Sequence, residues 1–240
     1  MSRKSLFLTS LIVVVLAAGI GAGLWLLFRH EPDFYVRAAV PSGQQRTQWN
    51  DEFESKFFNS LLGGIVNLHD WGADFTQEQI NSYLAQDYLT KHSTENPLPE
   101  GISEPRIVFE PDHLRLGFRY GVGPWNTVVS LKLRVWLVAR ELNTVALEVE
   151  SLRAGALPIS AESLLQRIAD FVHRKDIDPI WYRRNGHPVL IVRFQADRTP
   201  QTFQLQRLDL EGGITHISGR SLENTPPTAP GLNTASFGGR

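Results

Sequence analysis

Cysteine is absent from the 240-residue sequence, and its absence excludes several kinds of chemistry. The chain can have no disulfide bond, thiol nucleophile, iron–sulfur cluster, cysteine zinc site or lipidated N-terminal cysteine. An excess of positive charge is also missing, because the formal net charge is −1, and this argues against a nucleic-acid partner. With 42% hydrophobic and 20% charged residues, the composition is that of a folded protein.

The signature motifs of common enzymes are missing as well: HExxH, GxSxG, GxxxxGK[ST] and GxGxxG do not occur. The densest histidine–carboxylate group is His69, Asp70 and Asp74, in a segment predicted as a loop between helices, where solvated polar residues are commoner than metal ligands. Glu110 and Asp112 flank a turn, so local hydrogen bonding explains them better than the acid/base pair of a glycosidase. We therefore expect no enzyme, catalytic residue, metal or cofactor. Scattered aromatic residues favour packing over a carbohydrate platform: Trp71, Trp125, Trp136 and Trp181.

One long apolar run dominates the N-terminal region. Residues 6–28 carry no charge, and as a helix they would span roughly 35 Å, enough for a ~30 Å hydrocarbon core. Arg3 and Lys4 before the run favour a cytoplasmic N-terminus, a single pass through the cell membrane and an extracytoplasmic bulk. A cleaved signal peptide is the alternative, although its apolar part is usually about 7–15 residues. Gly19 and Gly23 have the small-xxx-small spacing that packs two membrane helices.

The rest of the chain is expected to form one α+β domain. After residue 30 it carries 21 Lys and Arg against 25 Asp and Glu, a net charge of −4. Without disulfides, such a domain depends on its hydrophobic core for stability. The predicted division is a cytoplasmic stub and transmembrane helix at 1–30, a juxtamembrane linker at 31–48, the extracytoplasmic domain at 49–220 and a disordered tail at 221–240.

Two stretches before residue 100 have helical periodicity, and a third follows later. Apolar residues recur every three to four positions over 49–68, which predicts an amphipathic helix. A second helix is predicted to begin at Thr76, where Gln79 completes a capping box and Phe75 meets Ile80 in a hydrophobic staple. A third is predicted at 161–173.

From residue 105 the apolar period changes to two, which predicts antiparallel strands at 107–110, 114–120, 126–140 and 144–153. The apolar positions of the last two strands are all odd-numbered, so opposed residues must sum to an even number. A three-residue loop at 141–143, with Asn143 left-handed, then opposes Arg134 to Glu150 and Trp136 to Glu148 as solvated pairs. Two further hairpins are predicted around the turns 185–186 and 212–213.

One face of this sheet is continuously apolar. It either forms an ordinary core under the helices or leaves a groove with room for an acyl chain, and both readings stay open. The residues predicted to line the groove are Leu116, Phe118, Leu131, Leu133, Val135, Leu137, Val145, Leu147 and Val149.

The order of these features resembles a known family. An anchor precedes the helix opening Phe-Thr-Gln-Glu-Gln-Ile-Asn-Ser-Tyr-Leu (75–84), and long strands precede Leu-Arg-Ala-Gly-Ala-Leu-Pro-Ile-Ser (152–160). In these motifs the chain resembles the YpmS-like bacterial membrane-anchored proteins of unknown function. By extension, the resemblance implies a tubular lipid-binding (TULIP-like) architecture, in which a long coiled antiparallel sheet packs on amphipathic helices. It implies no catalytic residues.

The sequence therefore favours a membrane-anchored extracytoplasmic domain that binds a lipid-like or other hydrophobic ligand by passive burial. The alternative is a structural or assembly module that uses a sheet edge or the 49–68 helix to bind an envelope protein partner. A hydrolase is the third possibility, but no cluster of converging carboxylates is visible.

Overall fold

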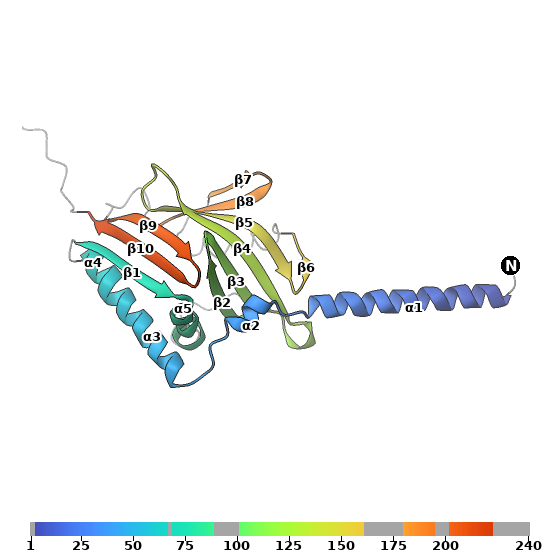
Figure 1. Cartoon of the computed structure of the whole chain (residues 1–240). Helices are drawn as coiled ribbons and strands as arrows, with labels where there is room; N and C mark the ends of the chain where they lie inside the picture. Colours follow the sequence, from blue (N-terminus) through green and yellow to red (C-terminus); the bar gives the residue numbers. More distant parts are fainter. Residues whose placement is uncertain (1–2, 67–68, 89–100, 161–179, 195–201, 223–240) are drawn as a thin grey trace, which may run out of the picture.

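The computed structural model describes residues 3–66, 69–88, 101–160, 180–194 and 202–222, and its fold is α+β with large antiparallel sheets (Figure 1). The helical elements are α1 (Arg3–Phe28), α2 (Asp33–Arg37), α3 (Gln44–Lys56), the π-helical turn η1 (Phe57–Leu62), α4 (Gly63–Val66), α5 (Gln77–Tyr83), the π-helical turn η2 (Leu84–Tyr88) and the 3₁₀ turn η3 (Gly123–Trp125). The strands are β1 (Asp70–Thr76), β2 (Ile102–Glu110), β3 (His113–Tyr120), β4 (Thr127–Leu137), β5 (Thr144–Ala154), β6 (Leu157–Pro158), β7 (Ile180–Arg184), β8 (His187–Arg193), β9 (Phe203–Glu211) and β10 (Ile214–Ser221).

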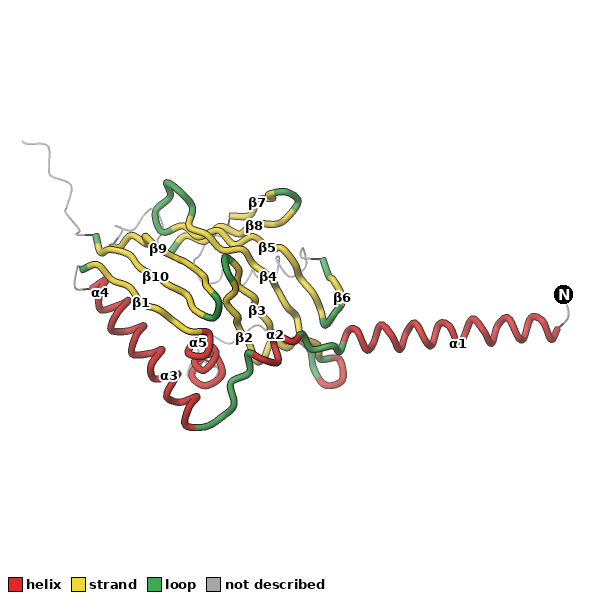
Figure 2. Tube along the Cα trace, in the orientation of Figure 1, coloured by secondary structure: helices red, strands yellow, loops and turns green. Residues whose placement is uncertain are grey.

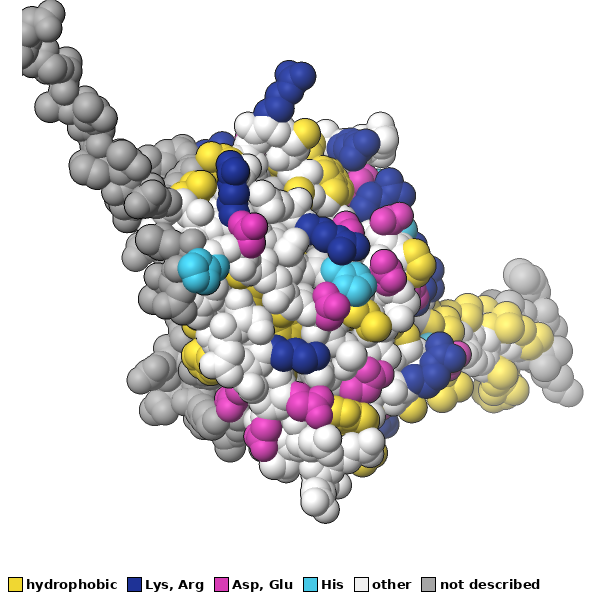
Figure 3. All heavy atoms as spheres, turned by 60° about the vertical axis from the view of Figure 1, so that its left-hand side comes forward, with side chains coloured by type: hydrophobic (Ala, Val, Ile, Leu, Met, Phe, Trp, Pro, Cys, Tyr) yellow, Lys and Arg dark blue, Asp and Glu magenta, His cyan; other side chains and the backbone are white. Residues whose placement is uncertain are grey.

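Helix α1 projects away from the rest of the molecule (Figure 1). By length and composition it could cross a membrane, and none of its most apolar stretch is buried inside the protein. Its 26 residues would span about 39 Å. The apolar surface of α1 contrasts with the face of the domain seen in Figure 3, where positive and negative side chains are interspersed.

The remaining elements form two sheets. The larger has the order β2-β3-β4-β5-β8-β7, with β6 paired to β5, and the smaller has the order β1-β10-β9. The smaller sheet lies at the end of the molecule away from α1, and α3 and α5 run beside β1 (Figure 2). A core of Leu61, Trp71 and Phe75 joins this sheet to the helices.

Two buried asparagines connect the two sheets and the helices through backbone groups. Asn81 of α5 donates to the Ile107 carbonyl and accepts from the Ile107 amide, each at 2.8 Å, so it pairs with β2 as a neighbouring strand would. Asn143, between β4 and β5, donates to the Phe203 carbonyl and accepts from the Leu205 amide, each at 2.7 Å. Each asparagine thus satisfies one donor and one acceptor of the adjacent strand.

Several sequence predictions are confirmed in detail. The capping box of Thr76 and Gln79 is present, and Phe75 and Ile80 belong to one apolar cluster as the staple requires. Asn143 is left-handed, with φ 53°. The hairpins β7–β8 and β9–β10 form around the predicted turns.

Other predictions were wrong in their boundaries. The segment that holds His69, Asp70 and Asp74 was expected as a loop, but from Asp70 onward it belongs to strand β1, because it pairs with β10. The expected linker at 31–48 contains α2 and the beginning of α3, because Phe34 and Tyr35 are buried against the large sheet. The helix expected at 49–68 begins at residue 44 and passes through a π-helical turn.

The register of β4 and β5 was also predicted incorrectly. Strand β4 ends at Leu137, and the Val138 amide still donates to the Thr144 carbonyl, so the unpaired connection runs over 139–143, five residues instead of three. Arg134 therefore lies opposite Glu148, and Trp136 lies opposite Ala146. The predicted ion pair between Arg134 and Glu150 forms all the same, with Arg134 Nη2 3.4 Å from Glu150 Oε1. Near the turn, the numbers of opposed residues still sum to an even number, as predicted. Farther along β5, Glu150 is the extra residue of a β-bulge. The predicted helix 161–173, the segment 89–100 and the tail beyond 222 lie outside the described residues.

Candidate functional site

The C-terminal end of α1 is hydrogen-bonded directly to the large sheet. The last carbonyls of a helix have no partner within the helix and need one from elsewhere. Here the Thr127 hydroxyl donates to the Phe28 carbonyl, and the Ala156 amide donates to the Leu27 carbonyl at 2.8 Å. A Cβ on Gly155 would lie 2.3 Å from both carbonyl oxygens, so glycine permits this close approach. The sheet therefore holds the end of α1 in a fixed position.

The chain that follows α1 is held against the same sheet by α2. Tyr35 is fully buried, its hydroxyl donates to the Glu104 carbonyl at 2.8 Å, and Arg106 lies 4.1 Å above its ring. A Cβ on Gly117 would lie 2.6 Å from the Tyr35 ring, so the absence of a side chain in β3 makes the space for α2. Burial raises the pKa of Tyr35 to about 12, even though the nearby Arg106 favours the phenolate.

Between α2 and the β5–β6 turn lies a cavity of about 370 Å³, which we call the basic cavity. Its floor is made by the polar face of β3, β4 and β5, and its walls by the chain after α1 and by the β5–β6 turn. None of the residues described around it is acidic. They are His30, Pro32, Phe34, Arg115, Ser130, Leu131, Lys132, Ser151, Arg153, Gly155 and Ala156.

Strand register brings the cations of the basic cavity together. Arg115 is opposite Lys132, which is opposite Ser151, and Ser130 is opposite Arg153 in the neighbouring row. Directly opposed side chains on antiparallel strands have their Cβ atoms about 4.5–5.5 Å apart. Like charges at that spacing repel each other, so the arrangement needs a counter-charge.

Two of these cations have carboxylate partners. Arg115 Nε lies 2.7 Å from Glu110 Oε1, and Lys132 Nζ lies 3.0 Å from Glu150 Oε2. Burial opposes the ionisation of Glu150, but hydrogen bonds from His113 and Lys132 outweigh it and lower the pKa of this carboxyl group. In the part of the chain that the structure describes, Arg153 has no ion-pair partner.

The apolar face predicted as a ligand wall lies on the opposite side of β3, β4 and β5. Register places all nine predicted residues on this one face. Phe118, Leu131, Leu133, Val145 and Val149 are buried, and the other four are half-buried. Among the members of this face, Leu131 also lines the basic cavity.

The other candidate sites do not assemble. Asp74 lies opposite His216, with His216 Nδ1 2.7 Å from Asp74 Oδ1, and no three metal-ligating side chains meet among the described residues. Glu110 is paired with Arg115, and Asp112 adopts the left-handed turn conformation. The tryptophans separate too: Trp71 is in the small sheet, Trp125 is beside α1, and Trp136 and Trp181 are on opposite faces of the large sheet.

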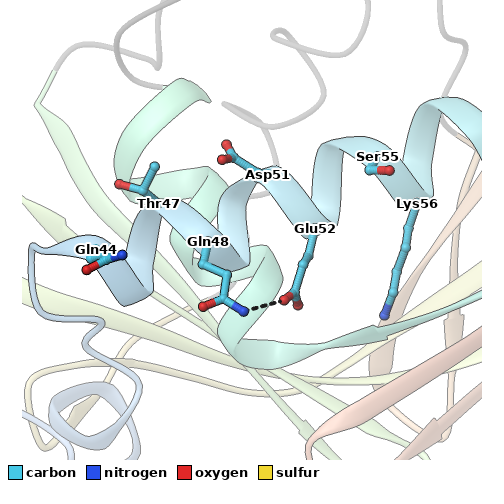
Figure 4. Close-up of a pocket in the computed structure, with 7 residues that line it drawn as sticks. All are labelled: Gln44, Thr47, Gln48, Asp51, Glu52, Ser55 and Lys56. Atoms are coloured by element: carbon cyan, nitrogen blue, oxygen red, sulfur yellow. Dashed lines mark hydrogen bonds between the residues drawn. The ribbon is translucent and has the colours of Figure 1, made fainter.

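A second hollow, of about 680 Å³, follows one helix and offers a weaker candidate (Figure 4). All its lining residues come from α3. Glu52 accepts from Gln79 at 2.9 Å and from Gln48 at 3.0 Å, and these hydrogen bonds lower its pKa. Lys56 donates to the Asp74 carbonyl at 3.0 Å. These groups hold α3 against α5 and β1, so their polar atoms are already used in packing.

No family model, curated protein or solved structure matches this chain. The resemblance to the YpmS-like family therefore stays a prediction, and no residue role is taken from it.

Sequence analysis missed the basic cavity. The period-two alternation predicted the apolar face of the strands and assigned no role to the polar positions between them. The available signal was three cations at alternating positions in three strands, on the face opposite the apolar one. Their convergence depends on the register and on the placement of α2 by Gly117.

Proposed function

We propose that this chain is a single-pass, membrane-anchored, non-enzymatic protein whose extracytoplasmic α+β domain binds a lipid-like ligand at the membrane surface. The observation that carries the proposal is the fixed junction between α1 and the sheet. With α1 in a bilayer, that junction holds one end of the large sheet at the lipid headgroups. The apolar face defined above stays the predicted wall for an acyl chain.

Exposed apolar side chains at this junction support the proposal. Trp125 is 68% exposed and Val122 is 80% exposed, both in the connection between β3 and β4. The Trp125 ring meets the Trp25 ring of α1 edge-on, with centroids 5.1 Å apart. Tryptophan is enriched at membrane interfaces, where its ring and its N–H group meet apolar and polar surroundings together.

Native mass spectrometry of the full chain, extracted from membranes in mild detergent, tests the ligand. We expect a lipid bound at about one copy per protein, because passive burial gives about 0.8 kcal/mol per CH₂ group. A clean lipid-free mass with no uptake of added phospholipid would overturn the proposal.

The absence of cysteine makes the topology easy to test. Gln206→Cys, on the exposed part of β9, should react with a membrane-impermeant maleimide in intact cells. Ser2→Cys should react only after the cells are permeabilised. The reverse labelling pattern would contradict an extracytoplasmic domain.

A second candidate function, an assembly module, is favoured by one patch of exposed apolar residues. Phe58 is 58% exposed and Leu62 is 40% exposed in η1. Turns of π-helix are often found at functional sites. This candidate predicts co-purification with another membrane protein in a fixed ratio, which Phe58→Asp should abolish; recovery of the wild-type chain alone in gentle detergent would argue against it.

A further inference from the structure

The basic cavity combines the groups that phosphate recognition requires. Arginine and lysine donate charge-assisted hydrogen bonds to phosphate oxygens, and serine hydroxyls add neutral ones. Arg115, Lys132 and Arg153 supply the first kind, and Ser130 and Ser151 supply the second. A volume of about 370 Å³ lies within the range of small-ligand sites, roughly 300–1,000 Å³.

The hydrogen-bonding capacity of these cations is only partly used. Arg115 Nε lies 2.7 Å from Glu110 Oε1 but makes no hydrogen bond within the described ranges, and the guanidinium carbon lies 5.4 Å from the centre of the Phe34 ring. Arg153 is exposed and lacks a described carboxylate partner. Arg115 and Lys132 are paired with Glu110 and Glu150, and Glu150 is shared with Arg134, whereas Arg153 has no described carboxylate partner. An anion would supply the missing counter-charge.

The position of the basic cavity relative to α1 indicates which anion would lie next to it. His30 and Pro32, which line it, lie within four residues of the end of α1. The helix would span about 39 Å, and a bilayer with its headgroups is about 40–45 Å thick. With α1 across the membrane, the cavity therefore lies at the depth of the phospholipid phosphates.

We propose that the basic cavity binds a phosphate group through Arg115, Lys132 and Arg153, and that a phospholipid headgroup supplies it. This inference rests on the proposed function, because the source of the phosphate follows from the anchoring of α1. A soluble phosphate compound has the same recognition chemistry, so the experiment separates the two sources.

Arg153→Gln is the principal test variant, because it removes one charge at an exposed position without breaking a described ion pair. Lys132→Gln is the second, and it also releases Glu150. Arg220→Gln is the matched control, since Arg220 is exposed on β10 in the other sheet and donates to Gln204. Near-UV circular dichroism checks that each variant is folded.

Each full-length protein is measured in two arms. Inorganic phosphate is titrated into the protein in non-ionic detergent by isothermal calorimetry. Separately, the protein is placed in nanodiscs of phosphatidylcholine and phosphatidylglycerol, and native mass spectrometry counts the phospholipids that stay bound. We expect phospholipid retention to fall about tenfold in Arg153→Gln and in Lys132→Gln, the loss of roughly one charge-assisted hydrogen bond, and to stay unchanged in Arg220→Gln.

Each outcome has a definite meaning. If both cavity variants retain phospholipid as the wild type does, the phosphate site is wrong while the lipid-binding function stands. If the wild type binds inorganic phosphate, loses it in the variants and retains no phospholipid, the headgroup assignment and the lipid-binding function are overturned, and the cavity takes a soluble phosphate. A wild type that binds neither overturns both proposals.

Discussion

Substitution of Asn143 should lower the stability of the protein strongly, because this one residue stabilises both a turn and a contact between the two sheets. It holds a left-handed turn, with φ 53°, and it pairs with the Phe203 carbonyl and the Leu205 amide of β9. Its side chain is almost fully buried. Substitution therefore tests both the turn and the contact between the two sheets.

The structure allows the two contributions to be estimated separately. Two hydrogen bonds contribute about 2 kcal/mol net to the free energy of unfolding. Phe203 and Leu205 of β9 are only half-buried, so water can bind their backbone groups when the asparagine is replaced, and no further desolvation cost is added. A residue with a Cβ costs roughly 1 kcal/mol more in the left-handed region. Asn143→Ala should lower the free energy of unfolding by about 3 kcal/mol, and Asn143→Gly by about 2 kcal/mol.

Chemical denaturation of the full chain in mild detergent, followed by tryptophan fluorescence, measures both values. Trp71 is a suitable reporter, since its ring lies 5.8 Å from that of Phe203 in β9. The matched control is Asn185→Ala, because Asn185 is left-handed too but lies in an exposed hairpin, and it should cost only about 1 kcal/mol. If Asn143→Gly unfolds like the wild type, the hydrogen bonds to β9 do not contribute as argued; if the glycine and alanine variants unfold alike, the estimate for the turn is wrong.

Three further predictions concern the basic cavity and its walls. Gly117→Ala should lower the free energy of unfolding by about 1–3 kcal/mol, because its Cβ would overlap the Tyr35 ring. We expect faster hydrogen exchange in α2, and unchanged exchange would contradict the packing argument. Gly155→Ala should free the end of α1, because it adds a Cβ against the Phe28 carbonyl at φ 61°, and protease resistance at the junction equal to that of the wild type would count against this. The lowered pKa of Glu150 means that its stabilising contribution is present above pH 4.5 and is lost as the pH falls through its pKa in the folded protein. The stability difference between the wild type and Glu150→Gln should therefore shrink below pH 4.5, and a difference independent of pH would refute the assignment.

Local sequence signals predicted local structure well. The capping box at Thr76 and the turn at Asn143 depend on residues only a few positions apart, so their physics is visible in a short window. The apolar face of the large sheet was predicted for the same reason, since alternation along a strand determines which side chains share a face.

Long-range pairing was the information that local patterns lacked. The partner strand of β1 is β10, which lies about 140 residues later in the sequence. No local pattern near Trp71 predicts that pairing. The offset of Arg134 from Glu150 follows from a connection two residues longer than predicted. The basic cavity combines both difficulties, because it needs the correct register of three strands and a wall from α2, which the sequence presented as a linker.

The hydrogen bonds that fix the end of α1 also determine how far the domain can reach. A flexible linker of n residues lets its ends separate by roughly 5–6 Å × √n, so a tethered domain searches a volume of solution. Here the chain after α1 is held by Tyr35, and the helix itself is held at Gly155, so the helix acts as a rigid stalk. If α1 tilts, the large sheet therefore tilts with it. The basic cavity stays at a fixed distance from the end of α1, and a ligand must reach it there.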